Sequence, residues 1–170
     1  DADEVITREL RNEILGVIKG VRSINGYYIP RKNYFWGHFM KKGGQYPDYV
    51  IRLVKRGKGR FPCKSVHEQM DIDGEVGYLQ NPMLHYSYRT RADYWKKADA
   101  YISLTAQEFK EKNVPKTVWA YMYYVFWKPL ATCVNIFFRH KGFVDGITGF
   151  EFALYSGLHW AIAYRKFLKL

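Results

Sequence analysis

The spacing of apolar residues predicts a first half made of one helix and several short strands. Leu10, Ile14 and Val17 recur at helical intervals after Thr7, a residue type that caps helix N-termini, so residues 7–19 are expected to form a helix. Short alternating runs separated by Gly-rich and Asp-Gly turns predict strands at residues 27–36, 49–54, 60–68 and 76–85. The first half is therefore expected to be a helix followed by a mixed β region.

From Thr90 onward the apolar residues recur at helical spacing. Thr90 and Asp93 match a capping pair, and the helix that follows is expected to end before Pro115. Its buried face is predicted to carry Tyr94, Ala98, Tyr101, Thr105 and Phe109. Residues 117–138 are mostly apolar and aromatic, and Lys128-Pro129 interrupts this run. A Gly-rich connection at 142–149 leads to a second apolar helix at 150–167.

Composition narrows the class of protein. Hydrophobic residues make up 48% of the 170 residues, enough for one folded domain with a core. The net charge of +11 indicates an anionic partner, which could be nucleic acid, anionic lipid or a phosphorylated substrate. Cys63 and Cys133 are far apart and have no metal-ligand spacing, which suits a reducing compartment.

The C-terminal half is basic and aromatic. Nine Lys or Arg residues stand against three Asp or Glu residues from Lys110 onward. Each apolar stretch approaches the ~20 residues that cross a bilayer, but Lys128 in the middle of the first argues against a simple span. Helices lying in the headgroup layer of an anionic membrane fit this pattern, and a helical pair packed only on its own domain is the alternative.

The opening residues Asp1, Asp3 and Glu4 form a carboxylate-rich patch. Such hard oxygen ligands suit Mg²⁺ or Mn²⁺, which can neutralise the phosphates of a nucleotide. A solvated acidic segment without a ligand is the alternative.

His67 and His85 each lie at the end of a predicted strand, where a histidine could take part in chemistry. Glu68 beside His67 at a strand end could act as a general base, although the pair is not the zinc-protease motif, which would need a histidine at the position of Asp71. His85 at another strand end could complete a metal site or contact a diphosphate. For both, an ordinary structural histidine is the competing interpretation.

The stretch from Lys41 to Lys64 carries eight basic residues and only Asp48 as an acid. Because aromatic residues are interleaved with these charges, the stretch fits either a nucleic-acid surface or a site for a phosphorylated or acidic sugar acceptor. A solvated hairpin explains the same residues without a ligand.

The ordered set of motifs resembles the family 2 glycosyltransferases, in the branch of bacterial lipopolysaccharide-core β-glucosyltransferase-like proteins. The resemblance spans nearly the whole chain and rests on Asp1-Ala2-Asp3-Glu4, Gly26 to Arg31, Gly44 to Asp48, Arg52-Leu53, Val66-His67-Glu68, His85 to Tyr88 and Gly142 to Gly146.

This resemblance implies an α/β fold, namely the C-terminal part of a GT-A (Rossmann-like) domain in which a mixed sheet precedes C-terminal helices. Residues 1–89 would be the metal- and acceptor-binding part, and residues 90–170 a helical, membrane-associating region. The chain would begin at the D-x-D motif, so it would be a fragment without the strands that hold the nucleotide base.

The resemblance also assigns roles. Asp1 and Asp3 would hold a divalent cation, Mg²⁺ or Mn²⁺, on the donor diphosphate. Glu68 would be the base of an inverting single displacement, and His67 would orient it. Tyr28, Arg31, Asp48 and Arg52 would line the acceptor side, and His85 would contact the donor diphosphate.

The expected function is transfer of a sugar from a nucleotide-sugar to a cell-envelope glycan or lipid-linked acceptor, at the cytoplasmic face of a bacterial inner membrane, with no nucleic-acid partner. A basic nucleic-acid-binding module and a non-catalytic membrane-surface protein are the rivals. An enzyme needs its carboxylates to face one cleft, which separates these classes.

Overall fold

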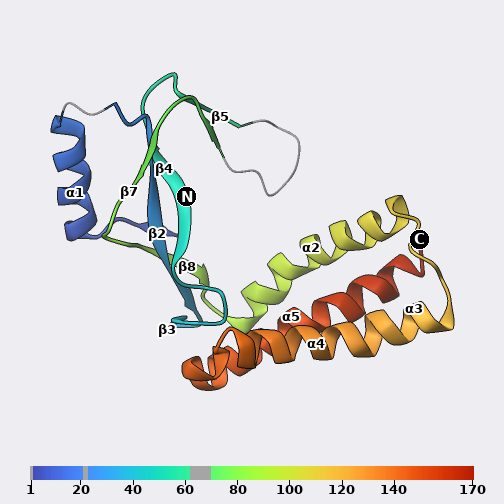
Figure 1. Cartoon of the computed structure of the whole chain (residues 1–170). Helices are drawn as coiled ribbons and strands as arrows, with labels where there is room; N and C mark the ends of the chain where they lie inside the picture. Colours follow the sequence, from blue (N-terminus) through green and yellow to red (C-terminus); the bar gives the residue numbers. More distant parts are fainter. Residues whose placement is uncertain (1, 21–22, 62–69) are drawn as a thin grey trace. The chain divides into compact units, whose positions relative to one another are not determined.

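The computed structural model describes residues 2–20, 23–61 and 70–170, drawn in colour in Figure 1. The chain divides into two compact units. The first comprises residues 1–34 and 45–87, and the second comprises residues 35–44 and 88–170. The sequence predicts a single division between residues 89 and 90. The second unit here also includes residues 35–44, which begin at the end of the strand β2 (Gly26–Phe35).

The first unit begins with the predicted helix. Helix α1 (Arg8–Lys19) is capped by Thr7, whose hydroxyl accepts a hydrogen bond from the Leu10 amide at 3.2 Å, and ends at Gly20. Leu10 is fully buried, and Ile14 and Val17 pack against the same core. The helical period and the cap were thus both predicted correctly.

A mixed sheet built around β2 forms the rest of this unit. The strand bounds are β1 (Glu4–Val5), β2 (Gly26–Phe35), β4 (Asp48–Val54), β5 (Gly59–Arg60), β6 (Asp71–Ile72), β7 (Val76–Tyr78) and β8 (Met83–Tyr88). β1 pairs with β8, which neighbours β2, while β4 (antiparallel) and β7 (parallel) also pair with β2. β5 and β6 form a separate two-stranded sheet. The apolar side of the larger sheet meets α1 through Tyr27, Ile29, Leu79 and Met83.

The strand expected at residues 76–85 is two strands. The chain leaves β7 after Tyr78 and enters β8 at Met83. Between them the Glu13 carboxylate accepts hydrogen bonds from the backbone amides of Gln80 and Asn81, at 2.8 and 2.9 Å. Pro82 has no amide hydrogen to give to a ladder. The Leu79 amide still bonds the Tyr28 carbonyl of β2, but Gln80 and Asn81 are held by α1. Of the strand expected at 60–68, residues 62–69 lie outside the described residues.

The second unit is mainly helical. It contains β3 (His38–Phe39) after the end of β2, and then α2 (Arg91–Glu111). Thr90 and Asp93 form the predicted capping box. Tyr94 and Phe109 on α2 are buried, as predicted. In the middle of the helix the buried residues are Ile102 and Ala106 instead of the predicted Tyr101 and Thr105, and Tyr101 is 41% exposed.

A helix runs without a break from Val118 to Arg139 and passes through Lys128-Pro129, where the apolar run of the sequence is interrupted. Its parts are α3 (Val118–Met122), η1 (Tyr123–Trp127), α4 (Lys128–Val134) and η2 (Asn135–Arg139), called the α3–η2 helix below. The segments η1 and η2 have the wider π-helical turn, in which the Lys128 amide bonds the Tyr123 carbonyl five residues back. Such a turn rearranges the hydrogen bonds just before Pro129, so the proline is accommodated instead of ending the helix.

The helix α5 (Gly146–Phe167) follows η3 (Gly142–Asp145) and starts one turn earlier than expected. The core of this unit joins Ile102, Ala106 and Phe109 of α2 to Val125 and to Ala161 and Tyr164 of α5. The coarse architecture is therefore mixed α/β, with a mixed sheet followed by C-terminal helices, in agreement with the fold class expected.

Gly157 lets α5 approach the α3–η2 helix closely. A Cβ atom at this position would lie 2.5 Å from the Pro129 carbonyl oxygen, inside the contact distance. We expect Gly157→Ala to lower the free energy of unfolding by about 1–3 kcal/mol, because the backbone of the α3–η2 helix has to shift. Urea unfolding measures this change.

The matched control is Gly16→Ala in α1, where a Cβ atom would meet nothing within 4 Å. Helix propensity alone should then raise stability by about 0.5–1 kcal/mol. A Gly157→Ala protein as stable as the Gly16→Ala protein would contradict the close packing.

Candidate functional site

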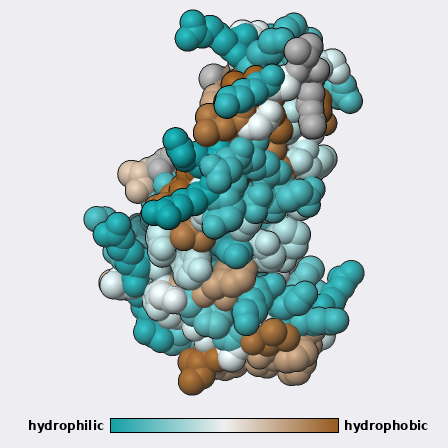
Figure 2. Space-filling model, turned by 90° about the vertical axis from the view of Figure 1, so that its left-hand side faces the viewer, coloured by the Kyte–Doolittle hydropathy of each residue, from teal (hydrophilic) through white to brown (hydrophobic). Residues whose placement is uncertain are grey.

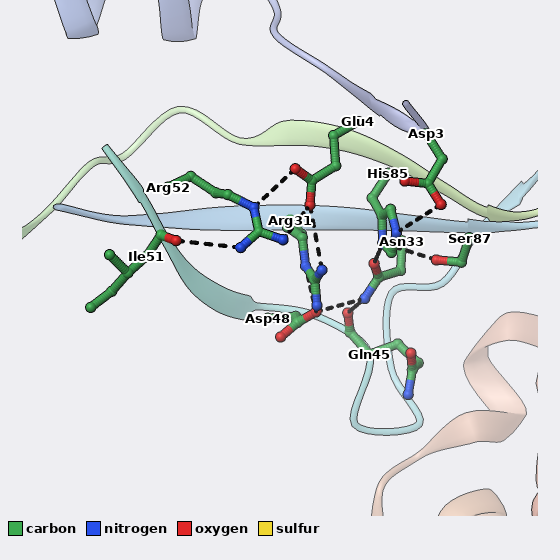
Figure 3. A network of polar contacts seen from close by, with 10 residues as sticks. All are labelled: Asp3, Glu4, Arg31, Asn33, Gln45, Asp48, Ile51, Arg52, His85 and Ser87. Atoms are coloured by element: carbon green, nitrogen blue, oxygen red, sulfur yellow. Dashed lines mark hydrogen bonds and ion pairs between the residues drawn. The ribbon is translucent and has the colours of Figure 1, made fainter. Parts of the chain in front are cut away.

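A polar network in the first unit gathers side chains from β1, β2, β4 and β8 (Figure 3). Strand register brings them together: Arg31 lies opposite Asp48 where β2 pairs with β4, and Glu4 lies opposite His85 where β1 pairs with β8. Figure 3 shows Arg52 at one side of this network, and Asp3 with His85 at the other.

The Glu4 carboxylate is the buried anion of the network. Its side chain is 7% exposed, and Arg52 binds both of its oxygens, Nε to Oε2 at 3.0 Å and Nη2 to Oε1 at 3.1 Å. Arg31 Nη1 lies 3.5 Å from Oε1. Burial pushes the pKa of Glu4 upward, but the hydrogen bond and charge of Arg52 and the charge of Arg31 outweigh it, so the pKa is lowered.

Asp48 links Arg31 to Asn33. Its Oδ2 atom accepts from Arg31 Nε at 2.9 Å and Nη2 at 2.6 Å, and from Asn33 Nδ2 at 3.1 Å. Asn33 Nδ2 also donates to the Gln45 carbonyl at 3.0 Å. These bonds all converge on one Asp48 oxygen, and the side chain is 30% exposed, so the second oxygen is placed for contact with a ligand.

Asn33 selects the tautomer of neutral His85. Because the Asn33 amide nitrogen donates to Asp48 and Gln45, its Oδ1 atom is an acceptor, and it lies 2.6 Å from His85 Nδ1. The Nδ1 atom therefore carries the proton, and Ser87 Oγ lies 3.0 Å from the same nitrogen. In neutral His85 the other nitrogen, Nε2, then carries a lone pair, and it lies 3.6 Å from Asp3 Oδ2.

Asp3 and His85 supply two oxygen or nitrogen donors of the type that divalent cations bind. Within residues 2–20, 23–61 and 70–170, no group of three or more His, Cys, Asp or Glu residues could hold a metal ion. The Glu4 carboxylate is directed at Arg52 and Arg31, which removes it from the expected acidic patch. The other expected ligand, Asp1, lies outside the described residues.

Five of the nine expected site residues are in this network: Asp3, Arg31, Asp48, Arg52 and His85. Tyr28 is not; its ring stacks on Tyr78 at a centroid distance of 5.0 Å. Asp1, His67 and Glu68 fall outside the described residues, so the geometry of the expected base stays a prediction.

Asn33, Gln45 and Ser87 belong to the network but were not expected there. A signal for two of them is present in the sequence, because Arg31 and Asn33 on β2, and His85 and Ser87 on β8, are spaced two residues apart. That spacing puts each pair on one face of its strand.

The basic stretch is partly neutralised within its own unit. Arg52 pairs with Glu4, and Lys58 pairs with Asp73 at 2.7 Å. These pairs reduce the positive charge available to a polyanion.

No helix among the described residues is both long and apolar enough to cross a membrane.

Over 98% of its length, the chain is 26% identical to a lipopolysaccharide core biosynthesis glycosyltransferase, LpsC, from Rhizobium meliloti (strain 1021). The aligned region is 62% of that protein, so the chain spans less than two thirds of its relative. No protein-family model matches the chain. No solved structure matches it either. The similarity supports a relationship to glycosyltransferases in general.

The network predicts a pH-dependent contribution of Glu4 to stability. Because the folded-state pKa lies below the ordinary value of 4.5, the stabilisation is present above pH ~4.5 and is lost as the pH falls through the folded-state pKa. We expect Glu4→Gln to lower the free energy of unfolding by about 1.5–3 kcal/mol at pH 7, since bonds to a charged group are lost. Urea titrations between pH 3 and pH 7 measure the difference, which should shrink with acid.

Glu111→Gln, at the exposed end of α2, removes the same charge away from the network and should change stability by less than about 0.5 kcal/mol. A Glu4→Gln effect that is constant from pH 7 to pH 3 would show that the ion pairs are not its source.

Proposed function

We propose that this chain is the metal- and acceptor-binding part of a glycosyltransferase that moves a sugar from a nucleotide-sugar to a glycan or glycolipid. The observation that carries the proposal is the similarity to a lipopolysaccharide core biosynthesis glycosyltransferase over 98% of the chain. The polar network supports it, because it gathers Asp3, His85 and the 30% exposed carboxylate of Asp48 on one part of the first unit.

The donor diphosphate would bind at Asp3 and His85. His85 is held by Asn33 and Ser87, so its Nε2 edge has a fixed direction toward Asp3. A protonated His85 would donate to a phosphate oxygen, and Asp3 with Asp1 would hold the divalent cation. That cation supplies positive charge where negative charge develops on the leaving diphosphate.

Glu68 would take the proton from the acceptor hydroxyl, with His67 orienting it. The acceptor oxygen then forms a bond to the anomeric carbon as the bond to the diphosphate oxygen breaks, so the configuration inverts. A carboxylate base suits this step because the hydroxyl proton must leave as the oxygen attacks.

The acceptor would contact Asp48 and the aromatic side chains near it. The Asp48 carboxylate is anchored through one oxygen by Arg31 and Asn33, so its other oxygen can accept from a sugar hydroxyl without losing its position. Arg31 and Arg52 would act mainly by holding Asp48 and Glu4. Tyr28, stacked on Tyr78, would offer a ring face to the sugar.

The finer assignment rests on the motif resemblance. From it we infer a family 2 enzyme with a GT-A fold, which would act on a lipopolysaccharide-core-like acceptor at the cytoplasmic face of a bacterial inner membrane.

Asp3→Asn is expected to weaken binding of a nucleoside diphosphate in the presence of Mn²⁺ by about tenfold or more, because a charged ligand of the cation is lost. In EDTA the wild-type and Asp3→Asn proteins should bind the nucleoside diphosphate with equal affinity. Isothermal titration of the complete protein measures both affinities. Asp71→Asn, on the exposed strand β6, is the matched control. Equal Mn²⁺-dependent affinity of the Asp3→Asn and Asp71→Asn proteins would remove Asp3 from the site.

Glu68→Gln in the complete protein should lower transfer by about 10²–10⁴-fold, since a general base is removed, while donor binding stays nearly unchanged. Transfer to a deacylated core oligosaccharide, followed by mass spectrometry, measures the rate for a panel of nucleotide-sugars. Glu9→Gln, on the exposed side of α1, should retain full activity. Wild-type turnover in Glu68→Gln would assign the base elsewhere.

A further inference from the structure

The α3–η2 helix exposes an apolar face along its whole length. This outer face is defined by Trp119, Met122, Phe126, Trp127, Leu130 and Phe138, of which Trp119 is 84% exposed and Trp127 62%. Two shallow apolar depressions follow one another along it, and they meet at Trp127 and Leu130. A monomeric protein rarely leaves so extended an apolar surface in water, so the outer face indicates an interaction site.

The charged side chain in the middle of this helix packs against α5. Lys128, the one charged residue between Val118 and Phe138, places Nζ 3.9 Å from the ring centroid of Trp160 on α5. The exposed positions from Val118 to Phe138 are all apolar or aromatic. The neighbouring helix α2 is the contrast, since charged residues such as Lys96, Asp99 and Glu108 occupy its exposed positions. The outer face is therefore not an ordinary solvated helix surface.

Charge identifies the kind of partner. The sequence has no Asp or Glu between Lys112 and Lys141, while Lys112 and Lys116 precede the outer face and Arg139 and Lys141 follow it. An apolar face rich in Trp, with basic residues at both ends, matches the layered chemistry of an anionic bilayer, in which acyl chains lie beneath charged headgroups.

Helix α5 extends this apolar character. Ile147, Phe150, Leu154 and Leu158 lie at helical spacing and are 37–77% exposed. Figure 2 shows apolar residues on the second unit, at the bottom of the view, where the α3–η2 helix ends and α5 begins. Exposed apolar residues on two helices suit a bilayer better than they suit a narrow groove-binding peptide.

We propose that the outer face of the α3–η2 helix lies in the interfacial layer of an anionic membrane, with Trp119, Phe126 and Trp127 inserted among the lipid chains and the flanking basic residues on the headgroups. The inference deepens the proposed location at a membrane and uses nothing of the proposed chemistry. Vesicle binding is measured without donor or acceptor, so its failure leaves glycosyl transfer untouched.

The test uses the full chain with vesicles of phosphatidylcholine alone and vesicles containing 30% phosphatidylglycerol. Flotation should recover the protein with the anionic vesicles, and tryptophan emission should shift to shorter wavelength. The double variant Trp119→Ser/Trp127→Ser should bind at least tenfold more weakly, and Arg139→Glu/Lys141→Glu should lose the preference for anionic lipid. Because all four side chains are exposed, circular dichroism and the unfolding midpoint should stay as in the wild type.

Tyr101→Ser on α2 is the control, since it removes a 41% exposed aromatic residue from another helix of the same unit and should bind like the wild type. No flotation with anionic vesicles would overturn the proposal. So would equal binding of the double variant, or equal binding to both kinds of vesicle. A dimer in light scattering that Trp119→Ser/Trp127→Ser dissociates, without vesicle binding, would assign the outer face to a second copy of the chain.

Discussion

A buried carboxylate has to be neutralised, and in this protein that requirement ties together strands that are distant in the sequence. Glu4 is nearly inaccessible to water, and the arginines that neutralise it come from β2 and β4. Arg31 in turn holds Asp48, and Asn33 passes the chain of hydrogen bonds to His85. An unpaired charge in such a place costs several kcal/mol, so the pairing also selects one register of the sheet. The same ion pairs therefore determine both the arrangement of the polar network and the register of the sheet.

Local signals in the sequence were sufficient to predict where α1 and α2 begin. Thr7 and Thr90 cap the helices that their spacing predicted, because a cap and a helical period act within one turn of the chain. The boundaries of β4 were also close to the prediction, for the same reason. The break between β7 and β8 was missed because it depends on Glu13, which lies 67 residues before the amide it accepts from.

The charged residues of the polar network were named from the sequence, whereas its neutral residues were not. Arg31, Asp48 and His85 are residue types that suggest chemistry on their own. Asn33 and Ser87 gain their meaning from strand pairing, which decides that the Asn33 amide lies between Asp48 and His85. Register is set by distant partners, so a linear pattern contains little of it. The residues alone likewise do not show that the helix passes through Pro129, because that depends on the π-helical turn before it.

The π-helical turns on either side of Pro129 have a geometric consequence for the exposed apolar residues of the α3–η2 helix. Met122, Phe126, Leu130, Val134 and Phe138 repeat every four residues. On an ideal helix of 3.6 residues per turn, each such step drifts by about 40° around the axis, so the five side chains would spiral away from one another. The wider turns at η1 and η2 take up extra residues and offset that drift. The wider turns therefore keep these aromatic and aliphatic side chains closer to one straight row along the helix.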